Sequence, residues 1–229
     1  MKKNQALGLL LLSFILFCNC DVSVNRSIHL RDGEHSGGQT SVNGSIYVGA
    51  RCRVDGDCRT VNGSIQVGDD SQVGSLDTIN GRITLAARVE VDGSASTVNG
   101  SIHSGSGSKI HDRLTTVNGR MELQKSEVDE ELSTVNGNIL LLDRSLVHGN
   151  IVIKGRRGHF FGNRHIEIRI EAGSIVEGNI DVQDPENKVE VYISKDADVK
   201  GEIRNAKVIR EKPAFVESPS AGTAPEAGR

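Results

Sequence analysis

The chain has 229 residues, of which 26 are glycine, none is tryptophan and only 3% are aromatic, and its formal net charge is −3 at pH 7. Large cores usually depend on aromatic side chains for buried area, so this composition favours short aliphatic strands and many turns over packed helices. The chain also lacks the basic surplus that is typical of nucleic-acid-binding proteins, and we expect no nucleic-acid partner.

Residues 1–20 predict a signal peptide. Lys2 and Lys3 form a positively charged start, and the apolar run from Ala6 to Phe17 is shorter than the roughly 20 residues that a membrane-spanning helix needs. Two routes of processing remain open, namely cleavage after Cys20 and lipidation of Cys20 as in a bacterial lipoprotein. An uncleaved signal that anchors the chain is the third alternative. All three predict an exported protein of the periplasm or a membrane.

A five-residue motif recurs through residues 21–153. The sequence from Val42 to Ile46, Val-Asn-Gly-Ser-Ile, returns from Val61 and from Val98, and near copies fill the intervals. Successive asparagines of the motif are 18 or 19 residues apart, which is the signature of a repeat architecture. These asparagines are Asn25, Asn43, Asn62, Asn80, Asn99, Asn118 and Asn136.

Eighteen residues divide into three hexads, and an aliphatic residue recurs at almost every sixth position from Val24 to Ile153 when three single-residue slips are allowed. A second apolar series, which includes Ile46, lies two residues earlier, so each hexad predicts a short strand with two inward residues and then a corner. In this register Val61 and Val98 point inward. The exceptions to the aliphatic series are Ser36, Ser104 and Asp129. The pattern predicts an all-β fold, a single-chain parallel β-helix with about 18–19 residues per triangular coil and roughly nine coils.

The Asn-Gly-Ser segments predict one corner of each coil. Asparagine and glycine tolerate the positive φ angles that tight bends use. Stacked coils would place the seven asparagines above one another, and such a ladder satisfies side-chain amides from coil to coil. We therefore expect a structural asparagine ladder, with a ligand-binding row as the alternative.

Two cysteines lie in the repeat region. Cys52 points inward in the predicted register, and Cys58 begins the next face. Export permits a disulfide between them, and two thiols remain the alternative. Neither a His nor a third Cys lies in register nearby, so no metal site is predicted here.

The pattern breaks after Ile153. Residues 154–165 predict an insertion loop in which Phe160 and Phe161 cover a flank of the solenoid. Residues 166–210 predict irregular final coils, and the Pro-, Ala- and Ser-rich residues 211–229 predict a disordered tail. Neither end of the solenoid carries an obvious cap, which permits end-to-end assembly.

The serial Thr-Val-Asn-Gly segments at 60–63, 97–100, 116–119 and 134–137 resemble a family of bacterial secreted or membrane-attached adhesins with β-solenoid repeats. The resemblance covers about residues 22–153. It implies a β-solenoid that contacts an envelope or surface partner.

The later motifs, from Val176 to Ile180 and from Val199 to Ile203, look like those of bactofilins. That resemblance implies a triangular β-helix that polymerises without nucleotide. The hexad register is also similar to that of hexapeptide-repeat acyltransferases, whose catalysis needs a histidine at a subunit interface, but no histidine here lies in a matching motif.

We therefore expect an exported, non-enzymatic structural or adhesive protein of the bacterial cell envelope, with no cofactor. A self-polymerising bactofilin-like scaffold is the alternative. A polysaccharide-active β-helix enzyme is a further alternative, and it would need clustered carboxylates in a groove. The grouped carboxylates Asp69-Asp70 and Asp129-Glu130-Glu131 are interpreted instead as solvated corners.

Overall fold

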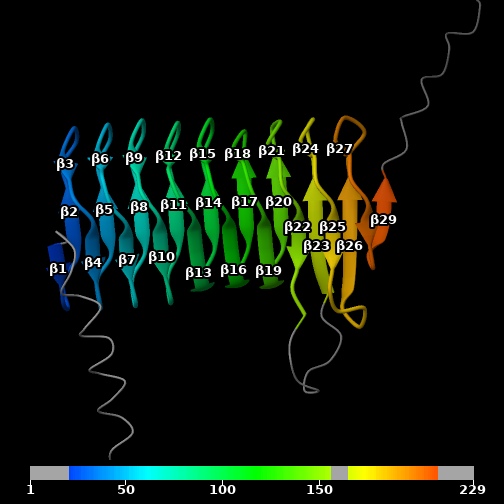
Figure 1. Ribbon diagram of the computed structural model, residues 1–229, viewed down its shortest axis with the longest axis horizontal. Coiled ribbons are helices and arrows are strands. Elements are labelled where there is room, and N and C mark those ends of the chain that lie inside the picture. Colours follow the sequence, from blue (N-terminus) through cyan, green and yellow to red (C-terminus); the bar gives the residue numbers. More distant parts are fainter. Residues whose placement is uncertain (1–20, 156–164, 211–229) are drawn as a thin grey trace, which may run out of the picture.

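The computed structural model describes residues 21–155 and 165–210. The predicted signal peptide with Cys20, most of the predicted insertion loop with Phe160 and Phe161, and the predicted tail lie outside these residues. The described chain winds into coils that stack along one axis (Figure 1), and every regular element in it is a strand. It therefore includes no helix that could cross a membrane.

The strands form three parallel sheets. The first sheet contains β1 (Asp21–Ser23), β4 (Gln39–Ser41), β7 (Cys58–Thr60), β10 (Leu76–Thr78), β13 (Ala95–Asn99), β16 (Leu114–Asn118), β19 (Leu132–Asn136), β22 (Ile151–Ile153), β25 (Ile180–Val182) and β28 (Ile203–Arg204). The second contains β2 (Ile28–Leu30), β5 (Ile46–Val48), β8 (Ile65–Val67), β11 (Ile83–Leu85), β14 (Ile102–Ser104), β17 (Met121–Gln124), β20 (Ile139–Leu142), β23 (His165–Ile170), β26 (Lys188–Ile193) and β29 (Lys207–Arg210). The third contains β3 (His35–Ser36), β6 (Arg53–Val54), β9 (Gln72–Val73), β12 (Glu90–Val91), β15 (Lys109–Ile110), β18 (Glu127–Val128), β21 (Leu146–Val147), β24 (Ile175–Val176) and β27 (Asp198–Val199).

Each strand pairs in parallel with the strand one coil further along the chain. Ile83, for example, lies between Ile65 and Ile102 in the second sheet. Parallel pairing at one-coil intervals aligns equivalent residues of successive coils in columns, which is why the period of 18 or 19 residues is so regular. The prediction of a parallel β-solenoid of about nine turns is confirmed. The coils continue to Arg210, and β23 and β26 are longer than the strands before them.

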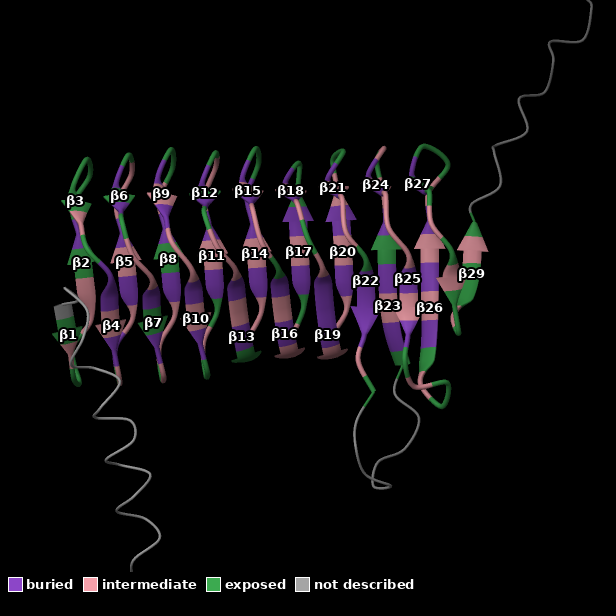
Figure 2. Cartoon of the chain, viewed as in Figure 1, coloured by how far each residue is buried: buried purple, intermediate pink, exposed green. Residues whose placement is uncertain are grey.

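The core is a continuous aliphatic column between the three sheets. Figure 2 shows that buried residues recur along the strands of successive coils. Inward residues such as Ile46, Ile65, Ile102 and Leu123 are fully or almost fully buried, and the residues between them face outward. Burying an aliphatic side chain of this size contributes about 1.5–3 kcal/mol, so each coil is stabilised by its neighbours and not by itself.

The predicted inward position of the residue before each asparagine is wrong. Ile79 is 45% exposed and Val98 is 38% exposed, whereas Thr78 and Thr97 before them are 4% and 2% exposed. The threonine side chain is buried, and its hydroxyl donates to a glycine carbonyl of the preceding coil, as from Thr97 to Gly81 at 2.9 Å. A buried hydroxyl is tolerated when it has such a partner.

The glycines of the Asn-Gly corner are predicted to be required for positive φ angles, but the structure shows that they are required for close stacking of the coils. A Cβ atom at Gly81 or Gly100 would collide with the carbonyl group of the glycine one coil earlier. Close stacking of the coils therefore excludes a side chain at this column. Of the seven asparagines at this corner, Asn25 alone has a positive φ, and most positive φ angles in the described chain lie at the corner between the second and third sheets, for example at Arg51, Asp70 and Arg88.

A column of buried serines completes that second corner. Ser108 Oγ accepts a hydrogen bond from the Val89 N–H at 3.1 Å and donates to the Ala86 carbonyl at 2.9 Å. Each serine thus satisfies main-chain groups that the bend leaves without a strand partner. The serines of the column are Ser71, Ser108, Ser126, Ser145 and Ser174.

Candidate functional site

The seven asparagines line one edge of the solenoid. The Nδ2 atom of each asparagine from Asn43 onward donates to the Oδ1 atom of the asparagine one coil earlier. The distances run from 2.7 Å at the Asn25 end to 3.4 Å between Asn136 and Asn118. The amides are used within the row, and this favours the structural role of the ladder over the ligand-binding row.

The two cysteines of the repeat region are both buried thiols. Cys52 occupies the column of buried serines, and its Sγ donates to the Arg31 carbonyl at 2.9 Å. Cys58 lies at the start of β7 on the inner face of the first sheet. In the structure Cys52 and Cys58 are therefore two thiols and do not form a disulfide. Cys20 lies outside the described residues.

The outer face of the third sheet carries the densest charge. The first outward column consists of the leading residue of each strand, namely His35, Arg53, Gln72, Glu90, Lys109, Glu127, Leu146, Ile175 and Asp198. The second consists of the residue that follows each strand, and from β6 onward it reads Asp55, Gly74, Asp92, His111, Asp129, His148, Glu177 and Lys200. Most of these side chains can ionise, so acidic and basic groups face one another from coil to coil.

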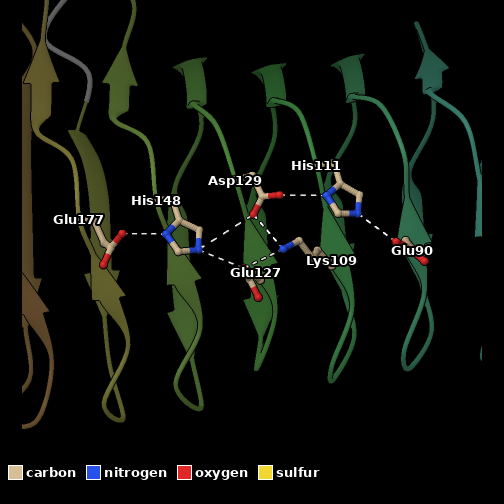
Figure 3. A network of polar contacts seen from close by, with 7 residues as sticks. All are labelled: Glu90, Lys109, His111, Glu127, Asp129, His148 and Glu177. Carbon is tan, nitrogen blue, oxygen red and sulfur yellow. Dashed lines mark hydrogen bonds and ion pairs between the residues drawn. The ribbon is translucent and has the colours of Figure 1, made fainter.

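Seven of these residues form one continuous set of contacts, which we call the third-sheet charge network: Glu90, Lys109, His111, Glu127, Asp129, His148 and Glu177 (Figure 3). At one end His111 connects two coils, because its Nε2 lies 3.0 Å from Glu90 Oε1 and its Nδ1 lies 2.9 Å from Asp129 Oδ2. At the centre Lys109 Nζ lies 2.9 Å from Glu127 Oε1 and 3.2 Å from Asp129 Oδ1.

His148 extends the network in the same way. Its Nε2 lies 3.0 Å from Glu127 Oε1, and its Nδ1 lies 2.7 Å from Glu177 Oε2. Lys200 Nζ then closes the row at 2.6 Å from Glu177 Oε1. The network spans the coils from β12 to β24, and Lys200 adds the coil of β27.

The contacts shift the ionisation of the groups toward the charged forms. Hydrogen bonds to Glu90 and Asp129 raise the pKa of His111, and those to Glu177 and Glu127 raise the pKa of His148. Hydrogen bonds from Lys109 and His148 lower the pKa of Glu127. Partial burial acts to raise the pKa of Asp129, but hydrogen bonds from His111 and Lys109 outweigh it and the pKa is lowered.

These shifts suit ion pairing better than acid catalysis. A carboxyl group that donates a proton near neutral pH needs a raised pKa, and both Glu127 and Asp129 are shifted in the opposite direction. The face can instead present ordered charges to a partner, or hold a cation through carboxylate and imidazole ligands.

Sequence reasoning missed this network. The solvated-corner interpretation of Asp129 omits its contacts with His111 and Lys109 on the neighbouring coil. Glu131 pairs with Lys154, and Asp70 pairs with Arg88, so these predicted solvated corners also carry ion pairs between coils. The available signal was the 18- or 19-residue period applied to charged residues, which places His111 and Asp129 in one column.

A shallow groove on the second sheet is a separate feature. Arg82 and Arg120 lie one coil to either side of Ser101, and both side chains are exposed. The groove is lined by Arg82, Thr84, Ser101, His103, Arg120 and Glu122. Two guanidinium groups at this spacing give the second sheet a face that can contact anionic groups.

Comparison with known proteins shows no relative: no family model, no curated protein and no solved structure matches the chain.

Proposed function

We propose that the chain is an exported, non-enzymatic structural or adhesive β-solenoid of the bacterial cell envelope, which acts through extended contacts of its flat faces. The observation that carries the proposal is the third-sheet charge network, since it repeats ionised groups coil after coil on a stacked parallel sheet. A periodic partner such as an envelope polymer can match such a face over many coils, and multiple weak contacts then add up to strong attachment.

The non-enzymatic part of the proposal is supported by the ionisation of the two central carboxylates of the third-sheet charge network; nearby exposed Glu130 differs, because its hydrogen bond with Asp112 raises its pKa. The lowered pKa values of Glu127 and Asp129 oppose a general-acid role, and both groups are engaged by Lys109. The proposed location is supported by the N-terminal pattern. Lipidation of Cys20 or an uncleaved signal would hold the solenoid at a membrane, with its faces available to the envelope.

The test is cosedimentation of the purified full-length chain with bacterial envelope fragments at low and high salt. The variant Glu177→Gln/Lys200→Gln removes the Glu177–Lys200 ion pair and the charged partner of His148 from the third sheet without changing the formal net charge. The control Arg59→Gln/Asp77→Asn removes an ion pair of the same kind from the first sheet. We expect the first variant to bind several-fold more weakly and the control to bind like wild type. Equal binding by both variants, or no sedimentation of the wild type, contradicts the proposal.

A second candidate, the self-polymerising scaffold, is favoured by the two ends of the solenoid. Val22 and Val24 in the first coil are 42% and 61% exposed, and Val208 in the last coil is 41% exposed. Open strand edges with apolar side chains are ready to pair with another chain. Negative-stain microscopy separates the candidates: rods of about 43 Å, nine steps of roughly 4.8 Å, favour the single solenoid, and long fibres that Val24→Lys shortens favour the scaffold.

A further inference from the structure

One arrangement of possible metal ligands occurs twice on the third sheet. Glu90 and Asp92 extend from one coil, and His111 extends from the next. Two coils further, Glu127 and Asp129 stand in the same relation to His148. In each group the candidate ligand atoms, which are two carboxylate oxygens and one imidazole nitrogen, lie within 4.8 Å of one another. We call these sets the first and the second triad.

The first triad is oriented by neighbouring side chains. Asp129 lies 2.9 Å from Nδ1 of His111, on the side of the ring away from Glu90, so the Nε2 atom is directed at the carboxylates. The side-chain amide of Gln72 donates to both oxygens of Asp92, at 2.9 and 3.1 Å. A carboxylate behind a ligating histidine and a hydrogen bond to a ligating carboxylate are the usual outer contacts of a metal site.

The two triads differ in whether a positively charged side chain contacts their carboxylates. In the second triad the ammonium group of Lys109 lies 2.9 Å from Glu127 and 3.2 Å from Asp129, so that place is filled by a positive charge. The third-sheet register puts Gln72 in the equivalent position before Glu90. Gln72 is neutral, and in the described chain no Lys or Arg side chain pairs with Glu90 or Asp92. The arrangement that holds an ammonium ion in one place therefore lacks that charge in the other.

We propose that Glu90, Asp92 and His111 bind one divalent transition metal ion of the zinc type, and that Lys109 takes the place of such an ion in the second triad. One imidazole nitrogen and two carboxylate oxygens suit Zn²⁺ and its neighbours better than Mg²⁺ or Ca²⁺, which prefer oxygen ligands alone. Small rotations of these surface side chains bring the three ligands to the roughly 2.0–2.2 Å that Zn²⁺ requires, and a water completes the tetrahedron. The ion would join the coil of β12 to the coil of β15. The inference does not depend on the proposed adhesive role.

The primary test is calorimetric titration of the full-length chain, purified without a polyhistidine tag in a non-chelating detergent buffer, with ZnCl₂ alone. We expect one equivalent to bind. His111→Gln should weaken binding at least about 100-fold, because it removes a ligand, and Gln72→Ala about 10-fold, because it removes an outer contact. His103→Gln is the matched control, since His103 is a half-buried histidine, as is His111, and lies 3.7 Å from Glu122 on the second sheet. It should bind zinc like wild type.

The second test uses the lysine that fills the second triad. Lys109→Met should bind two equivalents of zinc, and Lys109→Met/His148→Gln should return to one. Circular dichroism of each variant shows that the solenoid is intact. A wild-type chain that binds no zinc, or a folded His111→Gln variant that binds like wild type, overturns the metal site. A folded Lys109→Met variant that still binds one equivalent overturns the role of Lys109.

Discussion

At the scale of the residue, the asparagine ladder shows how a polar side chain stabilises a repeat. Asn99 donates to Asn80 at 3.0 Å and accepts from Asn118 at 2.9 Å. The contacts are exposed, so water replaces part of what a substitution removes, and the net worth of each is at the lower end of the range for hydrogen bonds.

We expect Asn99→Ala to lower the free energy of unfolding by about 1 kcal/mol, because two side-chain hydrogen bonds are lost at once. The measurement is urea unfolding followed by circular dichroism. Asn187→Ala is the control, since no hydrogen bond of that side-chain amide occurs in the described chain. A loss for Asn99→Ala no larger than that of the control would show that the ladder contributes nothing to stability.

Glu190 shows how a single carboxylate holds the last coil. Its oxygens accept hydrogen bonds from Lys207 Nζ at 2.8 Å and from the Tyr192 hydroxyl at 2.8 Å, and His165 lies 3.7 Å away. Lys207 belongs to β29, so the contact joins β26 to the terminal strand. The hydrogen bonds from Lys207 and Tyr192 lower the pKa of Glu190 below its usual value of 4.5.

A lowered pKa in the folded chain gives stability that is present above the unfolded value and is lost as the pH falls through the folded value. We therefore expect the amides of residues 203–210 to be better protected from hydrogen exchange in wild type than in Glu190→Gln at pH 7. The difference should shrink as the pH falls below 4.5 and vanish once Glu190 is protonated in the folded chain, after correction for intrinsic exchange. Glu202→Gln is the control, because Glu202 pairs with Arg204 of its own coil. A difference that persists or grows in acid contradicts the expectation.

At the scale of the element, the corner between the second and third sheets depends on buried hydroxyl groups. The column that contains Ser108 also contains Cys52, whose thiol already donates to a main-chain carbonyl. Most positions of the column hold a small polar donor, whereas Val89 and Ala197 occupy it with apolar side chains.

We expect Ser108→Ala to cost about 1–3 kcal/mol of unfolding free energy, because the Val89 N–H and the Ala86 carbonyl each lose a buried partner. Cys52→Ser should cost less than Ser108→Ala, because a hydroxyl keeps a donor for the main-chain carbonyl at this buried position. Urea midpoints of the two variants, with exposed Ser106→Ala as the control, check both statements. Equal losses for Ser108→Ala and Ser106→Ala would argue against the buried role.

At the scale of the whole molecule, stability is distributed along one axis. Each coil contacts its neighbours alone, so a central coil is supported from two sides and a terminal coil from one. Leu85 and Leu30 lie in the same inner column of the second sheet, but Leu85 is fully buried and Leu30 is 9% exposed in the terminal coil.

We expect Leu85→Ala to lower the free energy of unfolding by about 2–5 kcal/mol, as is usual for a cavity in a packed core. Leu30→Ala should cost less than half as much in the global transition, because the terminal coil can open locally. Urea unfolding and hydrogen exchange of residues 28–48 measure the two effects. Equal global losses would show that the solenoid unfolds as one block up to its ends.

The sequence alone determined the coil architecture. The constant spacing of the asparagines predicts stacked coils, because equal coil length is what brings equivalent residues into columns. The alternation around Ile46, Ile65 and Ile102 predicts most of the core, because alternate strand residues share a face. The sequence pattern wrongly predicts that Val98 points inward in the first sheet. Thr97 is buried instead, and a glycine carbonyl of the preceding coil accepts a hydrogen bond from its hydroxyl.

Only the tertiary structure decided the charged site. His111 lies 21 residues after Glu90 and 18 residues before Asp129, and these separations become contacts only when the outward columns of the third sheet are in register. The difference between neutral Gln72 and charged Lys109 as neighbours of the two triads likewise cannot be read from their positions in the sequence. It arises because stacking places one beside Asp92 and the other beside Asp129, and a side chain's electrostatic role depends on the charges that the fold puts within a few ångströms of it.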